Sequence, residues 1–355
     1  MFPYVNTGFL FKNEIISYNS ENISTDSIFK FGLGTIALRK IKIPEIKKGS
    51  LVFIDLKEQA NGDAYDRTGS VFAILPSHKQ TFLNALKYGI NSVPKINVNN
   101  YEFHGMVSSE IYETSLEMMR FFTPFGIHHF NHIKQKNKEW HDWVDYRQDI
   151  SEFAEVFSNK EIYIGVYIGN YDQNGHKVSA NITIHPDNQN LMPTKYVLPI
   201  FNTTNLLEMG GQEYPTIWSD NQSLIVDFIL NNDIKNAYLR YIATGHGGWE
   251  NGDEFVPKTH QILLNDVLTH KWLPWRVDCG SYRLFNPASG NFANGLSSSD
   301  LSRSNWCPGT VTNPIYIPLG DLKTGKHKLE VKIPQGNPEG NSFSYWNVSG
   351  VIIGE

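Results

Sequence analysis

Hydrophobic and polar residues alternate in short runs along most of the chain, and turn-forming residues separate these runs. In the segment 327–334, Leu329, Val331 and Ile333 stand two apart, with charged residues between them. This period of two is typical of a β-strand with one face on a core and the other in water. Together with similar runs elsewhere, it predicts antiparallel β-sandwiches. These other runs, rich in β-branched and aromatic residues, are 28–38, 51–56, 70–76, 161–169, 177–184, 222–230, 236–244, 259–266 and 343–354.

The chain divides into two β-rich halves. The stretch 185–196 gathers Pro, Asn and Asp between them, and 355 residues are enough for two buried cores. We therefore expect an N-terminal domain over 1–188 and a C-terminal domain over 195–355. Helical periodicity is weak, and its best candidates, 77–90 and 148–157, are predicted to be short excursions from the β framework.

The composition of the chain argues against nucleic acids and membranes as partners. The formal net charge is -5, which provides no basic face for a phosphate backbone and argues against nucleic acid. No apolar run approaches the ~20 residues that would span a bilayer, so no membrane partner is expected. The first residues lack a basic region followed by an apolar stretch, so they do not form a signal peptide as they stand. A mature or trimmed start is the simplest interpretation.

The cysteine content allows two interpretations. Cys279 and Cys307 are the only cysteines, 28 residues apart in a region rich in Gly, Asn and Trp. They form either one disulfide in an oxidising compartment or two buried thiols. A C-x-x-C metal or redox pattern is absent from the sequence, and two sulfurs alone would not hold zinc.

Two acidic turns are candidates for chemistry. Asp66 stands between Tyr65 and Arg67 just before a strand, and Glu254 follows Asp253 just before another. Taken alone, each is most simply a solvated turn with surface ion pairs. Neither turn predicts a function without a further signal.

That signal is a set of motifs in order along the chain. The C-terminal half carries an AYLR strand, a Gly- and His-containing loop, Glu254 ahead of a THQI strand, and Arg303 three residues before Trp-Cys-Pro-Gly. This order resembles the second domain of the peptide:N-glycosidase F family. The motifs in sequence order are Tyr65–Arg67, Thr123–Phe125, 237–240, 244–248, 259–262 and 306–309.

The resemblance implies a fold and an activity. It implies an all-β protein made of two side-by-side, eight-stranded antiparallel jelly-roll sandwiches, with the active cleft between them. It also implies a bacterial, periplasmic or secreted monomer that needs no cofactor and no metal. Its substrates would be N-glycosylated proteins or glycopeptides, in which it would cleave the amide between asparagine and the glycan.

The same resemblance assigns roles to single residues. Asp66 corresponds to the family's primary catalytic aspartate and Glu254 to its acidic partner from the second domain. Arg303 would line the cleft, where it could pair with a carboxylate or a sugar oxygen. Cys279 and Cys307 correspond to one family disulfide, while the other two are missing. We hypothesise that Asp66 acts on the scissile amide and that Glu254 orients water or substrate.

Aromatic side chains are expected to recognise the glycan. Sugar rings present C–H faces that stack on aromatic rings, and several aromatic residues flank the two acids and Arg303 in sequence. For each of them, packing in the core is the alternative. The expected substrate-binding residues are Tyr65, Arg67, Trp249, Phe255, Arg303 and Trp306.

The chain also departs from the family pattern. The family has a third acidic residue on a late strand of the first domain, and its place falls near Tyr167, with Asp172 as a nearby acid that could replace it. The segment 77–120 is longer than its family counterpart. It is predicted either to cover the cleft or to elaborate the surface.

Two other functions stay open. A cluster of histidines in 126–143 could ligate a metal, and jelly-roll pairs also occur in copper monooxygenases, although further ligand sets are lacking in the sequence. A solvent-exposed loop is the simpler interpretation of this cluster. The third possibility is a sandwich that binds glycans without cleaving them. The histidines are His128, His129, His132 and His141.

Overall fold

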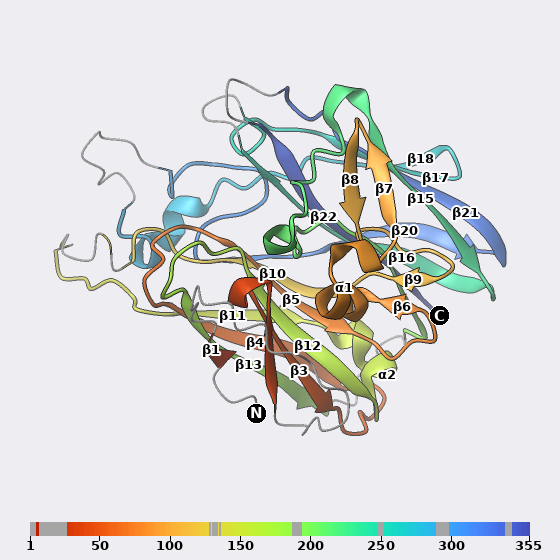
Figure 1. Cartoon of the computed structure of the whole chain (residues 1–355), viewed down its shortest axis with the longest axis horizontal. Helices are drawn as coiled ribbons and strands as arrows, with labels where there is room; N and C mark the ends of the chain where they lie inside the picture. The colour runs from red at the N-terminus through yellow and green to blue at the C-terminus, as the bar shows by residue number, and fades with distance from the viewer. Residues whose placement is uncertain are drawn as a thin grey trace.

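A computed structural model shows a protein built almost entirely of β-strands (Figure 1). Most of the N-terminal half lies in the lower part of the view and most of the C-terminal half in the upper part, which β7 (Lys95–Val98) and β8 (Tyr101–His104) also reach. The all-β prediction is confirmed. The predicted domain boundary, between 188 and 195, falls largely outside the described residues. The structure describes residues 5–6, 27–127, 129, 134, 136–186, 194–247, 252–288, 298–337 and 343–355.

Two antiparallel sheets form the N-terminal sandwich. Without the two-residue strands β1 and β19, the described part of this sandwich has eight strands. One sheet has the order β1 (Val5–Asn6), β13 (His176–His185), β4 (Leu51–Ala60) and β11 (Val144–Asp149). The other has the order β19 (Val311–Thr312), β10 (Leu116–Phe122), β5 (Thr68–Ile74), β12 (Glu161–Ile168), β3 (Ile36–Lys42) and β2 (Ile28–Phe31).

The burial pattern explains how these sheets are layered. In β4, Val52, Ile54 and Leu56 are buried in the core between the sheets, and the residues between them are more exposed. This alternation leaves the outer face of that sheet in water. In contrast, β10 is buried at every position and β5 at all but its first. Both faces of these two strands are therefore covered, one by the core and the other by neighbouring segments.

The C-terminal sandwich has two four-stranded antiparallel sheets. Its alternating segment forms a strand as predicted, with Leu329 and Val331 fully buried in the second core. One sheet has the order β14 (Tyr196–Asn202), β22 (Tyr345–Gly354), β16 (Ile234–His246) and β20 (Ile315–Leu322). The other has the order β15 (Ser223–Leu230), β21 (Gly325–Lys332), β17 (His260–Leu264) and β18 (Val267–Trp272).

A buried polar network joins the two sandwiches. The strand β19 belongs to the C-terminal half but pairs with β10, so that Thr312 lies opposite Arg120. Arg120 is fully buried, donates to Glu117 at 2.7 Å and also donates to Thr204 Oγ1 at 2.6 Å. Arg240 of β16 donates to two backbone carbonyls of β10. These contacts fix the register of the two halves, which positions the site at their junction.

The long segment between β5 and β10 packs on both halves. Phe82 of its helix contacts Phe72 of β5 edge to face, with ring centroids 5.6 Å apart. Phe103 joins the core of the C-terminal half. None of the described elements of this segment lines the cavity that holds Asp66 and Glu254, and the choice between a cover and a surface elaboration stays a prediction. The elements of this segment are β6 (Gln80–Thr81), α1 (Phe82–Tyr88), η2 (Ile90–Ser92), β7 (Lys95–Val98), β8 (Tyr101–His104) and β9 (Tyr112–Glu113).

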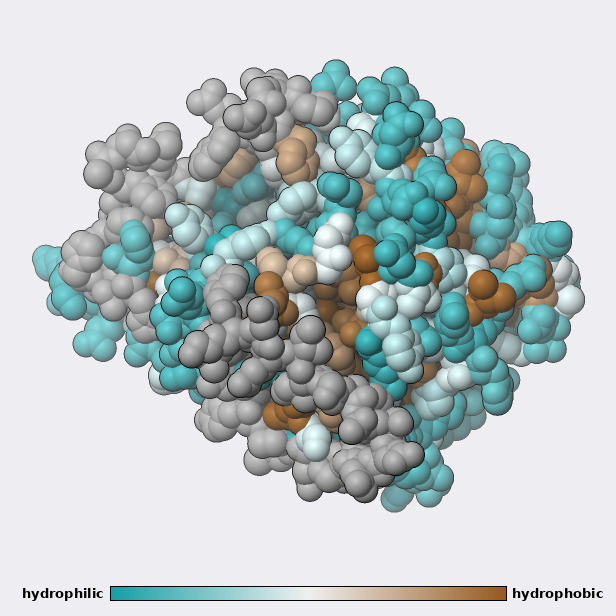
Figure 2. Space-filling view, viewed as in Figure 1, coloured by the Kyte–Doolittle hydropathy of each residue, from teal (hydrophilic) through white to brown (hydrophobic). Residues whose placement is uncertain are grey.

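The remaining helices are short. Both predicted helical excursions exist, as α1 and as α2 (Ala154–Phe157), and each occupies only part of its predicted range. Among the residues that Figure 2 colours by hydropathy, hydrophilic ones predominate, and hydrophobic residues form small patches near the centre and on the right. The 3-10 turns are η1 (Gly32–Gly34), η3 (Ser151–Phe153), η4 (Glu208–Gly210), η5 (Ser219–Asn221) and η6 (Cys279–Phe285).

Candidate active site

The loop before β5 presents Asp66 from the N-terminal half. Asp63 accepts hydrogen bonds from the backbone N–H of Tyr65 at 3.1 Å and from the Arg67 side chain at 2.7 Å. Thr123 Oγ1 accepts from the backbone N–H of Arg67 and donates to the Tyr65 carbonyl, both at 2.8 Å. Asp63 and Thr123 therefore fix the backbone on both sides of Asp66. Asx and Thr contacts of this kind are a common way to hold a loop.

The loop between β16 and β17 presents Glu254 from the C-terminal half. Its neighbour Asp253 is fully buried and accepts a hydrogen bond from Trp346 Nε1 at 2.6 Å. The backbone N–H of Gly336 also donates to Asp253, at 3.0 Å. The backbone N–H of Ser304 donates to the Glu254 carbonyl at 2.9 Å. Asp253 therefore anchors the loop, and Glu254 is free to face the junction.

Arg303 joins the two acids. Its side chain is fully buried, and Nη1 donates to Glu254 Oε1 at 2.9 Å and to Asp66 Oδ2 at 3.4 Å. Its guanidinium lies 4.5 Å from the centroid of the Trp306 ring and 5.1 Å from that of Phe255. Two carboxyl groups from different halves of the chain therefore converge on one nitrogen atom. Each carboxyl side chain is about one-fifth exposed.

Both carboxyl groups face one cavity of about 240 Å³. Both halves line it: β5 and β12 contribute Thr68 and Tyr167, and β16 and β22 contribute His246 and Tyr345. The lining includes Asp66, Arg67, Tyr167 and Tyr171 from the N-terminal half and Glu208, Tyr214, His246, Glu254, Trp306 and Tyr345 from the C-terminal half.

The surroundings of the acids change their proton affinity. The pKa of Glu254 is raised to about 7, because burial and the charge of Asp66 together outweigh the Arg303 guanidinium, which lowers it. Burial also raises the pKa of Asp66, and Arg303 again opposes it. A carboxyl group whose pKa is near neutral can exchange protons with a substrate at physiological pH.

A neutral histidine lies beside the acids. His246 is buried with its ring stacked on Tyr345 at 5.0 Å, and one ring nitrogen lies 2.8 Å from Thr244 Oγ1. Burial lowers the pKa of His246 well below its ordinary value, and the charges of Arg120 and Arg303 add to this effect. The imidazole therefore contributes no positive charge to the cavity.

The predicted substrate-binding residues occupy different environments. Tyr65 is 57% exposed beside the site, and Arg67 lies 5.0 Å from the ring centroids of both Tyr65 and Tyr171. Trp306 is buried, and its ring stacks on Phe122 at 4.2 Å, so it packs in the core and supports Arg303. Phe255 also lies against Arg303. Trp249 lies outside the described residues.

The two cysteines form a disulfide. Cys279 of η6 is bonded to Cys307, next to Trp306, which decides between the two interpretations of the sequence in favour of the crosslink. The disulfide ties η6 to the segment that carries Arg303. The crosslink therefore fixes the backbone four residues after Arg303, while burial restricts the side chain itself.

Several residues at the cavity were not expected from the sequence. Glu208, Tyr171 and Tyr214 line it, although none belongs to a recognisable motif. Tyr167, near which the resemblance predicts the place of the family's third acid, lines it too. Asp172, the proposed replacement, accepts a hydrogen bond from the backbone N–H of Asn174 at 2.7 Å and acts as a turn residue.

The histidine cluster is only partly described. His129 is exposed, and His141 packs against Phe285 with ring centroids 4.9 Å apart. His128 and His132 lie outside the described residues. Within the part of the chain that the structure describes, no three His, Cys, Asp or Glu side chains are grouped so that they could hold a metal ion.

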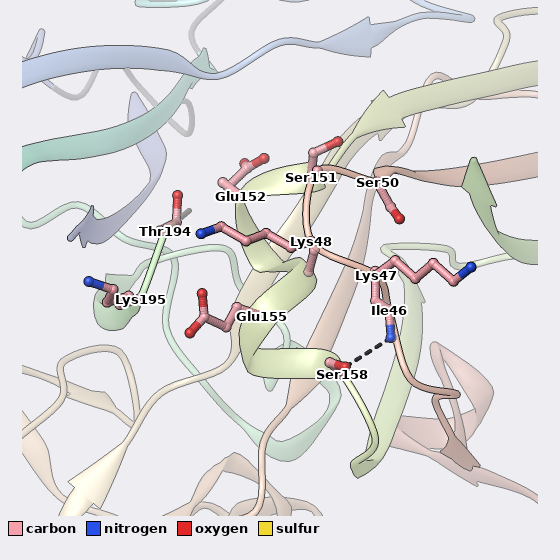
Figure 3. A pocket seen from close by; sticks show the side chains of 12 residues that line it. Ile46, Lys47, Lys48, Ser50, Ser151, Glu152, Glu155, Ser158, Thr194 and Lys195 are labelled. Atoms are coloured by element: carbon pink, nitrogen blue, oxygen red, sulfur yellow. Dashed lines mark hydrogen bonds between the residues drawn. The ribbon is translucent and has the colours of Figure 1, made fainter. Parts of the chain in front are cut away.

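A second cavity, of about 490 Å³, shares no lining residue with the site (Figure 3). Lys48, Glu152 and Glu155 reach into it, and Lys47 extends away on the other side. The dashed bond in the figure joins the backbone N–H of Ile46 to Ser158 Oγ at 2.9 Å. This cavity lacks the paired carboxyl groups and the shared arginine of the first.

The fold and the site together define a two-domain β-sandwich protein with paired carboxyl groups where the domains meet. Residues 9–184 match the family described as Peptide-N-glycosidase F, N terminal, and residues 213–353 match Peptide-N-glycosidase F, C terminal. The chain belongs to the peptide-N-glycosidase F family. The resemblance predicted from its motifs is thereby confirmed. A search of curated proteins gave no match.

Solved structures agree with this assignment. Two crystal forms of PNGF-II are 55% and 56% identical to the chain, each with a TM-score of 0.89, and cover 97% and 98% of it. The chain spans 64% of the length of PNGF-II. PNGase F from Flavobacterium meningosepticum, named a glycosylasparaginase, is 16% identical with a TM-score of 0.60, covering 93% of this chain and 92% of its own. The latter likeness shows the shared fold.

In the part of the chain that the structure describes, no helix has both the length and the apolar character needed to cross a membrane.

Proposed function

We propose that the protein is a peptide-N4-(N-acetyl-β-glucosaminyl)asparagine amidase. It hydrolyses the amide between an asparagine side chain and the first N-acetylglucosamine of an N-linked glycan, in glycoproteins or glycopeptides. Membership of the family supports this, and a fold relative bears the name of that amidase. The observation that carries the proposal is the convergence of Asp66 and Glu254, from different domains, on one nitrogen of Arg303.

The two carboxyl groups divide the work of hydrolysis. Asp66 acts on the scissile amide by accepting a hydrogen bond from its N–H, which holds the bond in place. Glu254 orients a water molecule and accepts its proton as the oxygen adds to the carbonyl carbon. A carboxylate with a pKa of about 7 is a suitable base for this step at neutral pH.

The reaction then balances without any other reactant. The C–N bond breaks, and the departing nitrogen takes the proton that Glu254 accepted. The products are an aspartate side chain and a 1-amino sugar. The single positive charge of Arg303 offsets part of the charge of the two carboxylates and so favours their ionised forms in a recessed site.

The compartment follows from the crosslink. A disulfide between Cys279 and Cys307 persists in an oxidising environment, so the proposed reaction takes place outside the reducing cytoplasm. Glycoproteins exposed at or beyond the cell surface are the matching substrates.

The test is a cleavage assay with an N-glycopeptide in water labelled with a heavy oxygen isotope. The proposed amidase releases the glycan and places the heavy oxygen in the new aspartate, which mass spectrometry detects. Asp66→Asn and Glu254→Gln are expected to lower kcat/KM by about 10²–10⁴-fold, the usual contribution of a positioned acid or base. Asp145→Asn, at an exposed position of β11, is the matched control and should retain full activity.

Two results would refute the proposal. A sandwich that binds glycan without cleaving it would release nothing in wild type and in every variant. An enzyme that cuts between sugars would leave the asparagine unchanged, with the heavy oxygen on the sugar.

A further inference from the structure

A third carboxyl group enters the same cavity. Glu208 begins the turn η4, after β14 of the C-terminal half, and it lines the cavity together with Asp66 and Glu254. The proposed hydrolysis assigns it no step. Its side chain is only partly buried, so it is accessible to a ligand in the cavity.

Two tyrosines hold this carboxyl group. Tyr171 and Tyr214 both donate hydrogen bonds to Glu208 Oε1, and their hydroxyl oxygens lie 2.9 Å apart. Tyr171 comes from the loop after β12 of the N-terminal half, whereas Tyr214 follows η4 in the other half. The cluster therefore spans the junction, as the pair of proposed catalytic acids does.

Burial and the neighbouring groups act on Glu208 in opposite directions. Burial raises the pKa of Glu208 above its ordinary value and outweighs the hydrogen bond from Tyr214 and the positive charge of Arg67, which lower it. Arg67 is itself fixed by Asp63 at 2.7 Å, so its charge stays close to the cluster. A carboxyl oxygen accepts hydrogen bonds from hydroxyl donors, and these bonds are strongest when the group is ionised.

Aromatic rings adjoin the same carboxylate. Tyr214 packs against Tyr345 with ring centroids 4.9 Å apart, and both residues line the cavity. A sugar ring presents hydroxyl groups at its edge and C–H groups on its faces. The Glu208 carboxyl group can accept hydrogen bonds from the hydroxyl groups, and the neighbouring tyrosine rings can pack against the C–H faces. A peptide backbone would instead need paired donors and acceptors along an extended edge.

We propose that Glu208, positioned by Tyr171 and Tyr214, binds hydroxyl groups of the N-acetylglucosamine ring next to the scissile amide and so determines sugar specificity. This inference rests on the proposed function for the identity of the sugar. The role is one of binding: Glu208 holds the ring while Asp66 and Glu254 act on the amide.

The experiment compares Glu208→Gln with Glu213→Gln. Gln keeps the size of the side chain and removes its charge, and Glu213 is an exposed glutamate of the same loop that provides the matched control. Two quantities are measured for each protein: kcat and KM with a glycopeptide, and the affinity for N,N′-diacetylchitobiose by calorimetry. Circular dichroism and the urea midpoint confirm that each variant is folded.

We expect Glu208→Gln to raise KM and to weaken disaccharide binding by about tenfold or more, the usual effect of losing hydrogen bonds to a charged group. Its kcat should stay within about threefold of wild type, because the group takes no part in the proton transfers. Tyr214→Phe should weaken disaccharide binding in the same direction by a smaller factor, and Glu213→Gln should change neither quantity.

The possible results are distinct. Disaccharide binding equal in Glu208→Gln and wild type would overturn the inference, as would a fall in kcat with unchanged binding, which would place Glu208 in the chemistry. If wild type binds the disaccharide through Glu208 but releases no glycan, the proposed hydrolysis fails and the sugar site stands.

Discussion

Replacing Asp66 by asparagine should make Glu254 a stronger acid. In the native protein, the negative charge of Asp66 is one of the causes that raise the pKa of Glu254 to about 7. Asparagine has nearly the same size and removes that charge. The titration of Glu254 should therefore move toward lower pH, even in a variant that no longer turns over substrate.

The geometry fixes the size of this effect. Oxygens of the two carboxylates contact the same Arg303 nitrogen at 2.9 and 3.4 Å. They are therefore at most about 6 Å apart, and two unit charges at that distance repel by about 1–3 kcal/mol at effective dielectric constants of about 20–40. Since one pH unit corresponds to about 1.4 kcal/mol, the midpoint of the Glu254 titration should fall by about one to two pH units.

The assay is a carbon-detected NMR titration of the glutamate carboxyl groups. The Glu254 signal is identified by its absence from Glu254→Gln, and Asp145→Asn serves as the charge-matched control at a distant exposed site. An unchanged or higher midpoint in Asp66→Asn would show that the two carboxyl groups do not interact. The shared-arginine geometry would then be wrong.

The wild-type pH profile gives an independent result. If ionised Glu254 activates water, kcat/KM should rise as pH increases through about 7, where the group loses its proton. A fall through the same range would mean that protonated Glu254 is the active form, and its role as base would be rejected.

Two further predictions concern stability, both measured by urea unfolding. His176 is fully buried, and its pKa is raised to about 9. Its protonation therefore stabilises the folded state by at most about 3 kcal/mol below about pH 6.5, and this contribution is lost as pH rises through about 9. His176→Gln should flatten this dependence of the unfolding free energy on pH, and an unchanged slope would contradict the assignment. Glu117→Gln should destabilise by about 3–5 kcal/mol, because it leaves the buried Arg120 charge unpaired. Glu161→Gln, in an exposed ion pair, should have a much smaller effect, and equal losses would argue against the buried network.

The strands could be predicted from the sequence where one face of the sheet is exposed to water. In 327–334 the alternation of apolar and charged residues identifies the strand and its buried face, which lies in the second core, although the strand runs from Gly325 to Lys332. The runs 70–76 and 161–169 lack this alternation. Their strands β5 and β12 are largely buried on both faces, so β propensity alone indicated them.

The candidate site was predictable only in part. The motifs around Asp66, Glu254 and Arg303 indicated a shared cleft because a resemblance linked segments that are distant in sequence. Glu208 and Tyr171 carry no local signal of this kind. They face the same cavity because η4 and the loop after β12 meet across the domain junction. That contact depends on the tertiary structure, so no local sequence pattern predicts it.

The proposed active site therefore depends on how the two domains are placed relative to each other. The N-terminal half supplies Asp66 and Tyr171, and the C-terminal half supplies Glu254, Glu208 and Arg303, so that neither half alone contains a complete site. A relative shift of the halves by even 1 Å is large compared with the tolerance of hydrogen-bond geometry. The buried network across β10, β16 and β19 prevents such a shift, because its charged groups lose their partners if the register changes. Weakening that network should therefore reduce activity before it unfolds the protein.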